Sequence, residues 1–151
     1  MLRFEGDVRL SLGIAAQRAC ELLLQPPAPE MLMVDLRTAE LLDSTTLGVL
    51  ARTAERFSTT QGRQALLLGP SEDLQRLLRS MGLTALFRIE PALALPDDGD
   101  LAPIAAAELD DDALRHAVID AHRALMNLSE ENKAEFTELV ETLTRLDRDD
   151  S

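Results

Sequence analysis

Few side chains in this sequence could do chemistry, and the most informative of them lie in one short segment. Residues 43–48 read Asp-Ser-Thr-Thr-Leu-Gly, so three adjacent hydroxyls follow a carboxylate. An apolar stripe with helical spacing predicts a helix from about Ser44 to Thr60. The free N–H groups at the start of a helix tolerate an anion, so a hydroxyl placed there is a candidate for phosphorylation. The predicted acceptor is Ser44, with Thr45 as the second choice and Thr46 also open.

The plainer alternative gives the same residues a purely structural role. Ser44 would then cap the helix and Asp43 would be a turn residue, since both types are common at such places. Composition alone favours this alternative.

Other reactive residue types are scattered. His116 and His122 lie six positions apart, on different faces of a helix, and with Asp120 and Glu130 a metal site can be imagined. Solvated polar side chains are the better interpretation of both histidines. Cys20 follows an apolar stripe and is expected to be a small core residue. The sequence therefore predicts no catalytic residue, no metal site and no cofactor.

Composition excludes several classes of function. The chain has 151 residues, of which 46% are hydrophobic, and a formal net charge of −12. Such acidity argues against nucleic acid and anionic membranes as partners, because both require a basic face. No apolar run approaches the roughly 20 residues of a membrane helix, and one cysteine provides no disulfide framework. We therefore expect a cytoplasmic protein without membrane insertion.

The first 90 residues alternate between strand and helix patterns. Short strands at 3–5 and 8–10 flank Gly6-Asp7, a dipeptide that favours a tight hairpin turn. This order predicts an α/β fold with a central β-sheet, mostly parallel or mixed, flanked by helices. The other strands are expected at residues 31–36, 65–68 and 86–89, and the helices at residues 12–24, 44–60 and 71–81.

The last third of the chain has a different character. Residues 1–100 carry a net charge of −4, whereas residues 101–151 carry −8. Prolines and Gly99 predict a linker over residues 91–107, followed by an acidic helical hairpin over 108–147. Isolated helices of this length are marginal in water, so their apolar stripes must cover each other, the α/β body or a second copy of the chain. The expected stripes are Leu114, Val118, Ala121 and Leu125 in one helix, and Phe136, Val140, Leu143 and Leu146 in the other.

The segment at 43–48 also carries a family resemblance. A buried strand, a short loop and Asp-Ser at the mouth of a helix resemble the STAS domain (sulfate transporter and anti-sigma factor antagonist), whose motif is Asp-Ser-Ser-Gly-Leu-Gly. The resemblance covers roughly residues 2–90, including the Leu77–Leu83 segment. Thr45 stands where the family usually has Ser, and Thr46 where it usually has Gly. These differences bear on how a kinase would fit the segment.

The resemblance implies a STAS-like domain over residues 1–90 that acts by partner switching. The unphosphorylated form would bind an anti-sigma factor or a serine switch kinase. That kinase would phosphorylate Ser44, and a PP2C-type phosphatase would remove the phosphate. The implied partner-binding residues are Asp43, Ser44, Thr45, Thr46, Leu47 and Gly48.

Two other roles remain open from the sequence. The chain could be a STAS-like subunit that clamps a transport ATPase, in which case phosphorylation is irrelevant. It could also be an adaptor that binds through its acidic hairpin. A homodimer formed through that hairpin is a further expectation that the sequence leaves open.

Overall fold

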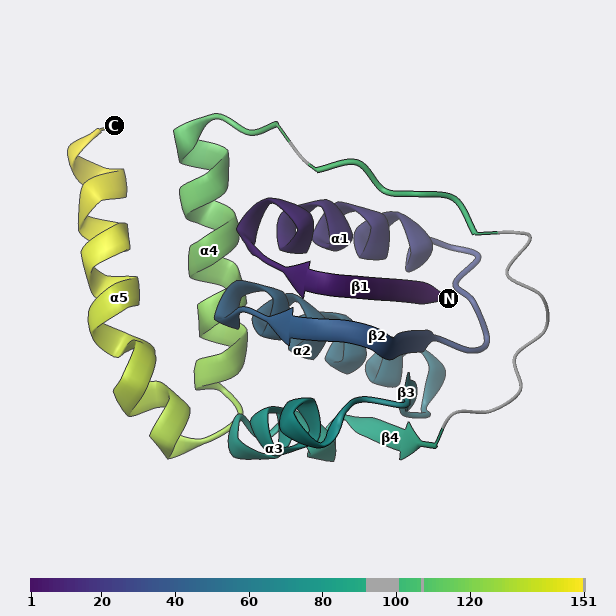
Figure 1. The fold of residues 1–151 in the computed structure, drawn as a ribbon. Helices are drawn as coiled ribbons and strands as arrows, with labels where there is room; N and C mark the ends of the chain where they lie inside the picture. The colour runs from purple at the N-terminus through teal and green to yellow at the C-terminus, as the bar shows by residue number, and fades with distance from the viewer. Residues whose placement is uncertain (92–100, 107, 151) are drawn as a thin grey trace.

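The protein is described by a computed structural model that covers residues 1–91, 101–106 and 108–150. Strands and helices alternate up to residue 90, and two long helices follow (Figure 1). The elements in chain order are β1 (Leu2–Val8), α1 (Leu10–Leu23), β2 (Met33–Leu42), α2 (Ser44–Gln61), β3 (Ala65–Leu68), α3 (Glu72–Ser80), the 3-10 helix η1 (Leu83–Ala85), β4 (Phe87–Glu90), α4 (Asp111–Met126) and α5 (Glu130–Asp149).

The sheet confirms the expected α/β class but is parallel throughout rather than mixed. Its four strands follow the order β1-β2-β3-β4, and each neighbouring pair is parallel. The predicted hairpin at Gly6-Asp7 is wrong, because β1 runs through both residues as one strand. Gly6 has φ of +61°, and the pairing register with β2 shifts between Gly6 and Asp7. The glycine therefore allows a bulge inside the strand, where a turn was expected.

β2 is longer than its apolar run suggests. The strand was expected at residues 31–36, but it continues through the mixed segment Arg37–Leu42. The extension pairs with the second half of β1, where Val8 lies opposite Leu42. Backbone pairing with β1, which is distant in the sequence, thus keeps residues 37–42 in a strand although their own pattern is not typical of one. As a result, β2 ends directly before Asp43.

A buried ion pair joins the two first strands. The Asp35 side chain is 1% exposed, and its carboxylate accepts hydrogen bonds from Arg37 and from Arg3, at 2.8 Å from each. Hydrogen bonding from Arg37 and, to a lesser extent, from Arg3 holds the pKa of Asp35 well below its usual range, although burial acts in the opposite direction. The carboxylate is therefore ionised, and it links β1 to β2 where Arg3 lies opposite Asp35.

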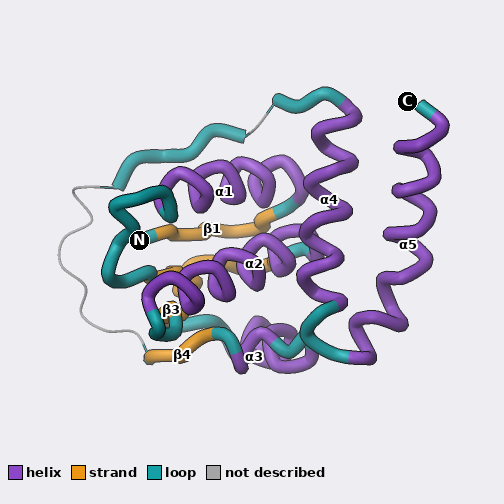
Figure 2. Tube along the Cα trace, turned by 180° about the vertical axis from the view of Figure 1, so that it is seen from behind, coloured by secondary structure: helices purple, strands orange, loops and turns teal. Residues whose placement is uncertain are grey.

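Helices α1 and α2 cover one face of the sheet. The strands lie in front of α2 in Figure 1, and α2 lies in front of the strands in Figure 2. The expected stripe of α2 is confirmed, since Leu47, Leu50, Ala51, Ala54 and Phe57 are all buried. This apolar face packs into one continuous core with β1 and β2.

The two C-terminal helices form the expected antiparallel hairpin, and the hairpin packs on the α/β body. α4 crosses the end of the molecule where β1 and β2 finish and α2 begins, and α5 lies outside α4 (Figure 1). Ala124, Leu125 and Phe136 belong to the same core as the sheet and α2. Of the expected stripes, Leu125 and Val140 are buried, whereas Leu146 is 47% exposed. The α4 and α5 hairpin therefore shares part of its core with the α/β body.

The side-chain amide of Asn132 anchors the turn of the hairpin to the α/β body. Asn132 is 2% exposed, and its Nδ2 donates to the carbonyl oxygens of Met81 and Leu125, at 2.9 Å each. Gly82, with φ of +79°, directly precedes η1, and a Cβ added there would lie 3.5 Å from the Cβ of Leu128 in this turn. Of the predicted linker, residues 92–100 and 107 lie outside the described residues, and 101–106 form neither helix nor strand.

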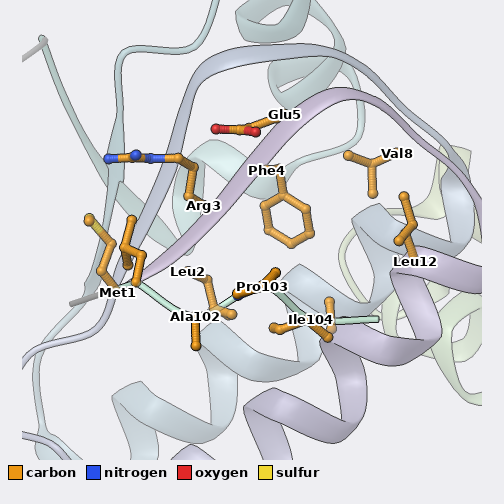
Figure 3. Close-up of a pocket in the computed structure, with 12 residues that line it drawn as sticks. Met1, Leu2, Arg3, Phe4, Glu5, Val8, Leu12, Ala102, Pro103 and Ile104 are labelled. Atoms are coloured by element: carbon orange, nitrogen blue, oxygen red, sulfur yellow. The ribbon is translucent and has the colours of Figure 1, made fainter. Parts of the chain in front are cut away.

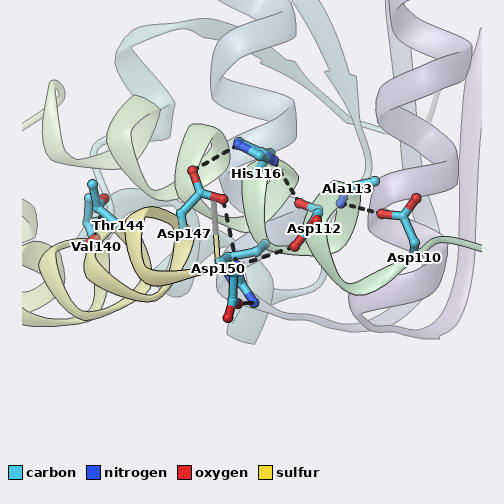
Figure 4. Close-up of polar contacts among 9 residues, drawn as sticks. Asp110, Asp112, Ala113, His116, Val140, Thr144, Asp147 and Asp150 are labelled. Carbon is cyan, nitrogen blue, oxygen red and sulfur yellow. Dashed lines mark hydrogen bonds and ion pairs between the residues drawn. The ribbon is translucent and has the colours of Figure 1, made fainter.

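The opposite end of the hairpin carries a cluster of ion pairs that is partly open to solvent (Figure 4). Arg115 of α4 lies 2.9 Å from Asp150, 3.4 Å from Asp112 and 3.7 Å from Asp147. The Nε2 of His116 lies 3.1 Å from the Asp147 carboxylate, and its Nδ1 lies 2.8 Å from the carbonyl oxygen of Asp112. These contacts join the start of α4 to the end of α5.

A mainly apolar hollow of about 470 Å³ lies beside β1 and α1 (Figure 3). Phe4, Val8 and Leu12 line it from these two elements, and Pro103 and Ile104 line it from the segment that leads to α4. None of the residues 43–48 contributes to this hollow. Within the described ranges, no helix combines the length and the apolarity needed to cross a membrane.

Candidate functional site

The candidate site begins where β2 ends. Asp43 is the N-cap of α2, and its Oδ1 accepts a hydrogen bond of 2.8 Å from the backbone N–H of Thr46. Ser44 is the first residue of the helix. The alternative in which Ser44 caps the helix is therefore wrong, because the carboxylate of Asp43 already fills that role. The Ser44 hydroxyl therefore takes no part in capping the helix.

Thr46 is accommodated by a glycine in the neighbouring helix. Its hydroxyl donates to Asp43 Oδ1 at 2.7 Å, so the capping carboxylate accepts both a backbone and a side-chain hydrogen. The residue packed against it is Gly13 of α1, where an added Cβ would lie 2.5 Å from the Thr46 hydroxyl oxygen. A glycine in α1 thus provides the space that a threonine in α2 needs.

The three adjacent hydroxyls differ in exposure. Ser44 is half-buried, whereas Thr45 is 5% exposed and Thr46 is fully buried. Leu47 and Gly48, the other two expected partner-binding residues, are also buried. Among these hydroxyls, Ser44 is the one that an enzyme reaches with the smallest structural change.

The Ser44 hydroxyl is hydrogen-bonded to a residue from the C-terminal hairpin. Its Oγ lies 2.9 Å from Nε2 of His122, and the Nδ1 of the same ring lies 2.7 Å from the carbonyl oxygen of Val118. A carbonyl oxygen only accepts, so Nδ1 carries the hydrogen. In the neutral ring Nε2 is then an acceptor, and the Ser44 hydroxyl donates to it. The imidazole is 2% exposed and packs edge-on against Phe136 of α5, with ring centroids 5.0 Å apart.

Two further contacts place α4 along the same stripe of α2. Gly48 packs so closely against Ala121 that an added Cβ would lie 2.1 Å from the Ala121 carbonyl oxygen. One helical turn further on, Arg52 lies 3.8 Å from the carboxylate of Asp120. Residues four apart share one face of a helix, so the face of α2 that carries Ser44 is the face that α4 covers.

The expectation for His122 is wrong, since this side chain is neither exposed nor solvated. His116, in contrast, is exposed, and it interacts with Asp147 instead of approaching His122. The two histidines thus have separate partners. No group of three or more His, Cys, Asp or Glu side chains in the described part of the chain is arranged to hold a metal ion.

Cys20 is a buried core residue, as expected. Burial raises the pKa of its thiol, and a hydrogen bond with Thr53 opposes this shift to a smaller degree. The thiol therefore stays protonated and poorly reactive near neutral pH.

Sequence reasoning missed the role of His122, although the signal was present. His122 follows Val118 by four positions and precedes Leu125 by three, so it lies on the predicted apolar stripe of its helix. A polar residue on such a stripe must meet a hydrogen-bonding partner where the stripe is buried. The identity of that partner depends on a contact between residues 78 positions apart.

A comparison with known protein families covers the α/β body of the chain. The family model described as STAS domain matches residues 2–95, which include every strand of the sheet and α1 to α3. The chain therefore belongs to the STAS domain family. No curated protein gives a significant match to it.

Proposed function

We propose that this STAS-domain protein is a phosphorylation-controlled anti-sigma factor antagonist that acts by partner switching in the cytoplasm. In its unphosphorylated form it binds an anti-sigma factor or a serine switch kinase through residues 43–48. One observation carries the proposal: Ser44 begins α2, its hydroxyl is not used in capping, and it is less buried than the two hydroxyls beside it.

The proposed modification follows the chemistry of the helix start. A serine kinase transfers the γ-phosphoryl group of ATP to Ser44 Oγ, the hydroxyl proton passes to the base of the kinase, and ADP leaves. A PP2C-type phosphatase hydrolyses the ester with water and releases inorganic phosphate. The added group carries about −1.5 to −2 charge at neutral pH, and the free N–H groups at the start of α2 tolerate it.

The modification acts on binding more than on folding. Its charge would stand beside the carboxylate of Asp43, which the helix needs as its cap. A partner that docks on this surface would have to accommodate two adjacent anions. A change of about 2 kcal/mol in binding free energy already alters affinity roughly thirtyfold.

The test compares wild type with Ser44→Ala and Ser44→Asp, each used as bait in extracts of the source organism and analysed by mass spectrometry. We expect an anti-sigma factor or a serine kinase to bind wild type and Ser44→Ala, and Ser44→Asp to lose at least 90% of it. The matched control is Ser80→Asp, which adds the same charge at an exposed serine of α3 and should bind normally.

Other outcomes would replace the proposal. Equal recovery of a transport ATPase with all four baits would indicate a STAS subunit whose function is independent of phosphorylation. A partner that is lost only when exposed acidic residues of α5 are changed would indicate an adaptor that binds through the hairpin.

A further inference from the structure

The face of α2 that would bind a partner is already occupied by part of the same chain. Ser44, Gly48 and Arg52 form one stripe of α2, and their contacts in α4 are His122, Ala121 and Asp120 respectively. Figure 1 shows α4 running across the start of α2, where this stripe begins. Any docking protein therefore meets α4 before it meets the centre of the stripe.

The way α4 crosses α2 could be reproduced by a helix from another protein. Its centre is a close approach of two backbones, which Gly48 allows because it has no side chain. On one side lies the hydrogen bond between Ser44 and His122, and on the other lies the pair Arg52–Asp120, whose side chains are 46% and 48% exposed. A helix from another protein with a small residue at the crossing would fit the same surface.

From these contacts we propose that the α4 and α5 hairpin is an autoinhibitory cover, which must leave α2 before a partner or a kinase can engage Ser44. The proposal rests on the function proposed above and adds its regulation. The surface fits a partner that presents a helix with a small side chain where Ala121 now lies.

The packing of the hairpin makes the covered form the resting state. Leu125 is fully buried and Phe136 is 7% exposed, and both belong to the core shared with α2. Release exposes these side chains, so the open form is a minor population. The apparent affinity of a partner is then lower than its intrinsic affinity by the fraction of molecules that are open.

The first experiment measures access to position 44 without any kinase or partner. Ser44→Cys is introduced together with Cys20→Ala, and the rate of alkylation by iodoacetamide is followed by mass spectrometry. Ala121→Arg is then added to force α4 away from Gly48. The matched control is Ala134→Arg, which places the same side chain at an exposed position of α5.

We expect Ala121→Arg to raise the alkylation rate at least tenfold, and Ala134→Arg to change it less than twofold. Equal rates in all three proteins would overturn the proposal, because Ser44 would then be accessible with the hairpin in place. Circular dichroism and urea unfolding check that each variant is folded.

A second measurement on the wild-type protein is decisive if Ala121→Arg does not fold. Hydrogen exchange under native conditions should show amides of α4 opening at a lower free energy than the amides of β2 and β3. Exchange of α4 only through global unfolding would overturn the proposal.

The two proposals can fail separately. If Ala121→Arg exposes position 44 but Ser44→Asp retains every partner, the cover exists and the partner-switching function is wrong. If Ser44→Asp loses its partner but alkylation is equally fast in all proteins, the function stands and the cover is wrong.

Discussion

The two halves of α4 are attached to the rest of the molecule by different kinds of contact. The second half packs through Ala121 and His122 directly against the backbone and the Ser44 hydroxyl of α2. The first half is joined through Arg115 and His116 to carboxylates at the end of α5, of which Asp150 is exposed and Asp147 is half-buried. One attachment is mainly buried and depends on shape, and the other is ionic and in partial contact with solvent.

The difference indicates which attachment holds the hairpin closed. Solvated ion pairs contribute little net free energy, because water and salt screen them and long side chains lose freedom. Buried contacts are stronger, because a lost partner leaves a cavity or an unpaired polar group. We therefore expect changes at the α2 contact to dominate the stability of the hairpin, and changes at the far end to matter little.

The largest effect is expected for Gly48→Ala. At this position helix propensity favours the change, whereas the close packing of α4 on α2 opposes it more strongly. Helix propensity alone favours alanine over glycine by about 1 kcal/mol. The new Cβ would lie 2.1 Å from the Ala121 carbonyl oxygen, so α4 must move. We expect a net loss of about 2 kcal/mol or more in the free energy of unfolding, measured in urea. A stabilised variant would show that the two backbones do not touch.

Asn132→Ala should have an intermediate effect. The change removes the donor to the carbonyl oxygens of Met81 and Leu125 at the buried hairpin turn. Leaving such acceptors without a partner should lower the free energy of unfolding by about 1 to 1.5 kcal/mol. Asn127→Ala, at an exposed position of the same turn, is the control and should stay near wild type. Equal stability of both variants would argue against the anchoring role of Asn132.

Asp150→Ala should have the smallest effect. Arg115 keeps two other carboxylates, those of Asp112 and Asp147, after the change. We expect less than about 1 kcal/mol of destabilisation in urea, decreasing further as NaCl is raised to 0.5 M. A large, salt-independent loss would reverse the comparison between the two attachments.

The elements of the α/β body could largely be predicted because their signals are local. The apolar stripe of α2 and a start near Ser44 follow from helical spacing, and both are confirmed. The start of α3 is also local, because the Ser71 side chain accepts a hydrogen bond from the backbone N–H of Leu74. The same local reasoning failed at Gly6, where a bulge and a hairpin turn require the same backbone freedom.

The surroundings of Ser44 could not be predicted because they depend on distant contacts. The sequence indicated that the hairpin must cover something, but not that α4 would cross α2 at Gly48. The role of Gly13 as the space for Thr46 also depends on the packing of α1 against α2. Such pairs become visible only when both partners are placed in one fold.

The edge-on contact between Phe136 and His122 lets α5, the outermost helix, influence Ser44 through the His122 ring. Phe136 of α5 packs against the imidazole, and the imidazole is hydrogen-bonded to the Ser44 hydroxyl. A substitution in the outermost helix could therefore change how this hydroxyl is held while leaving residues 43–48 unchanged.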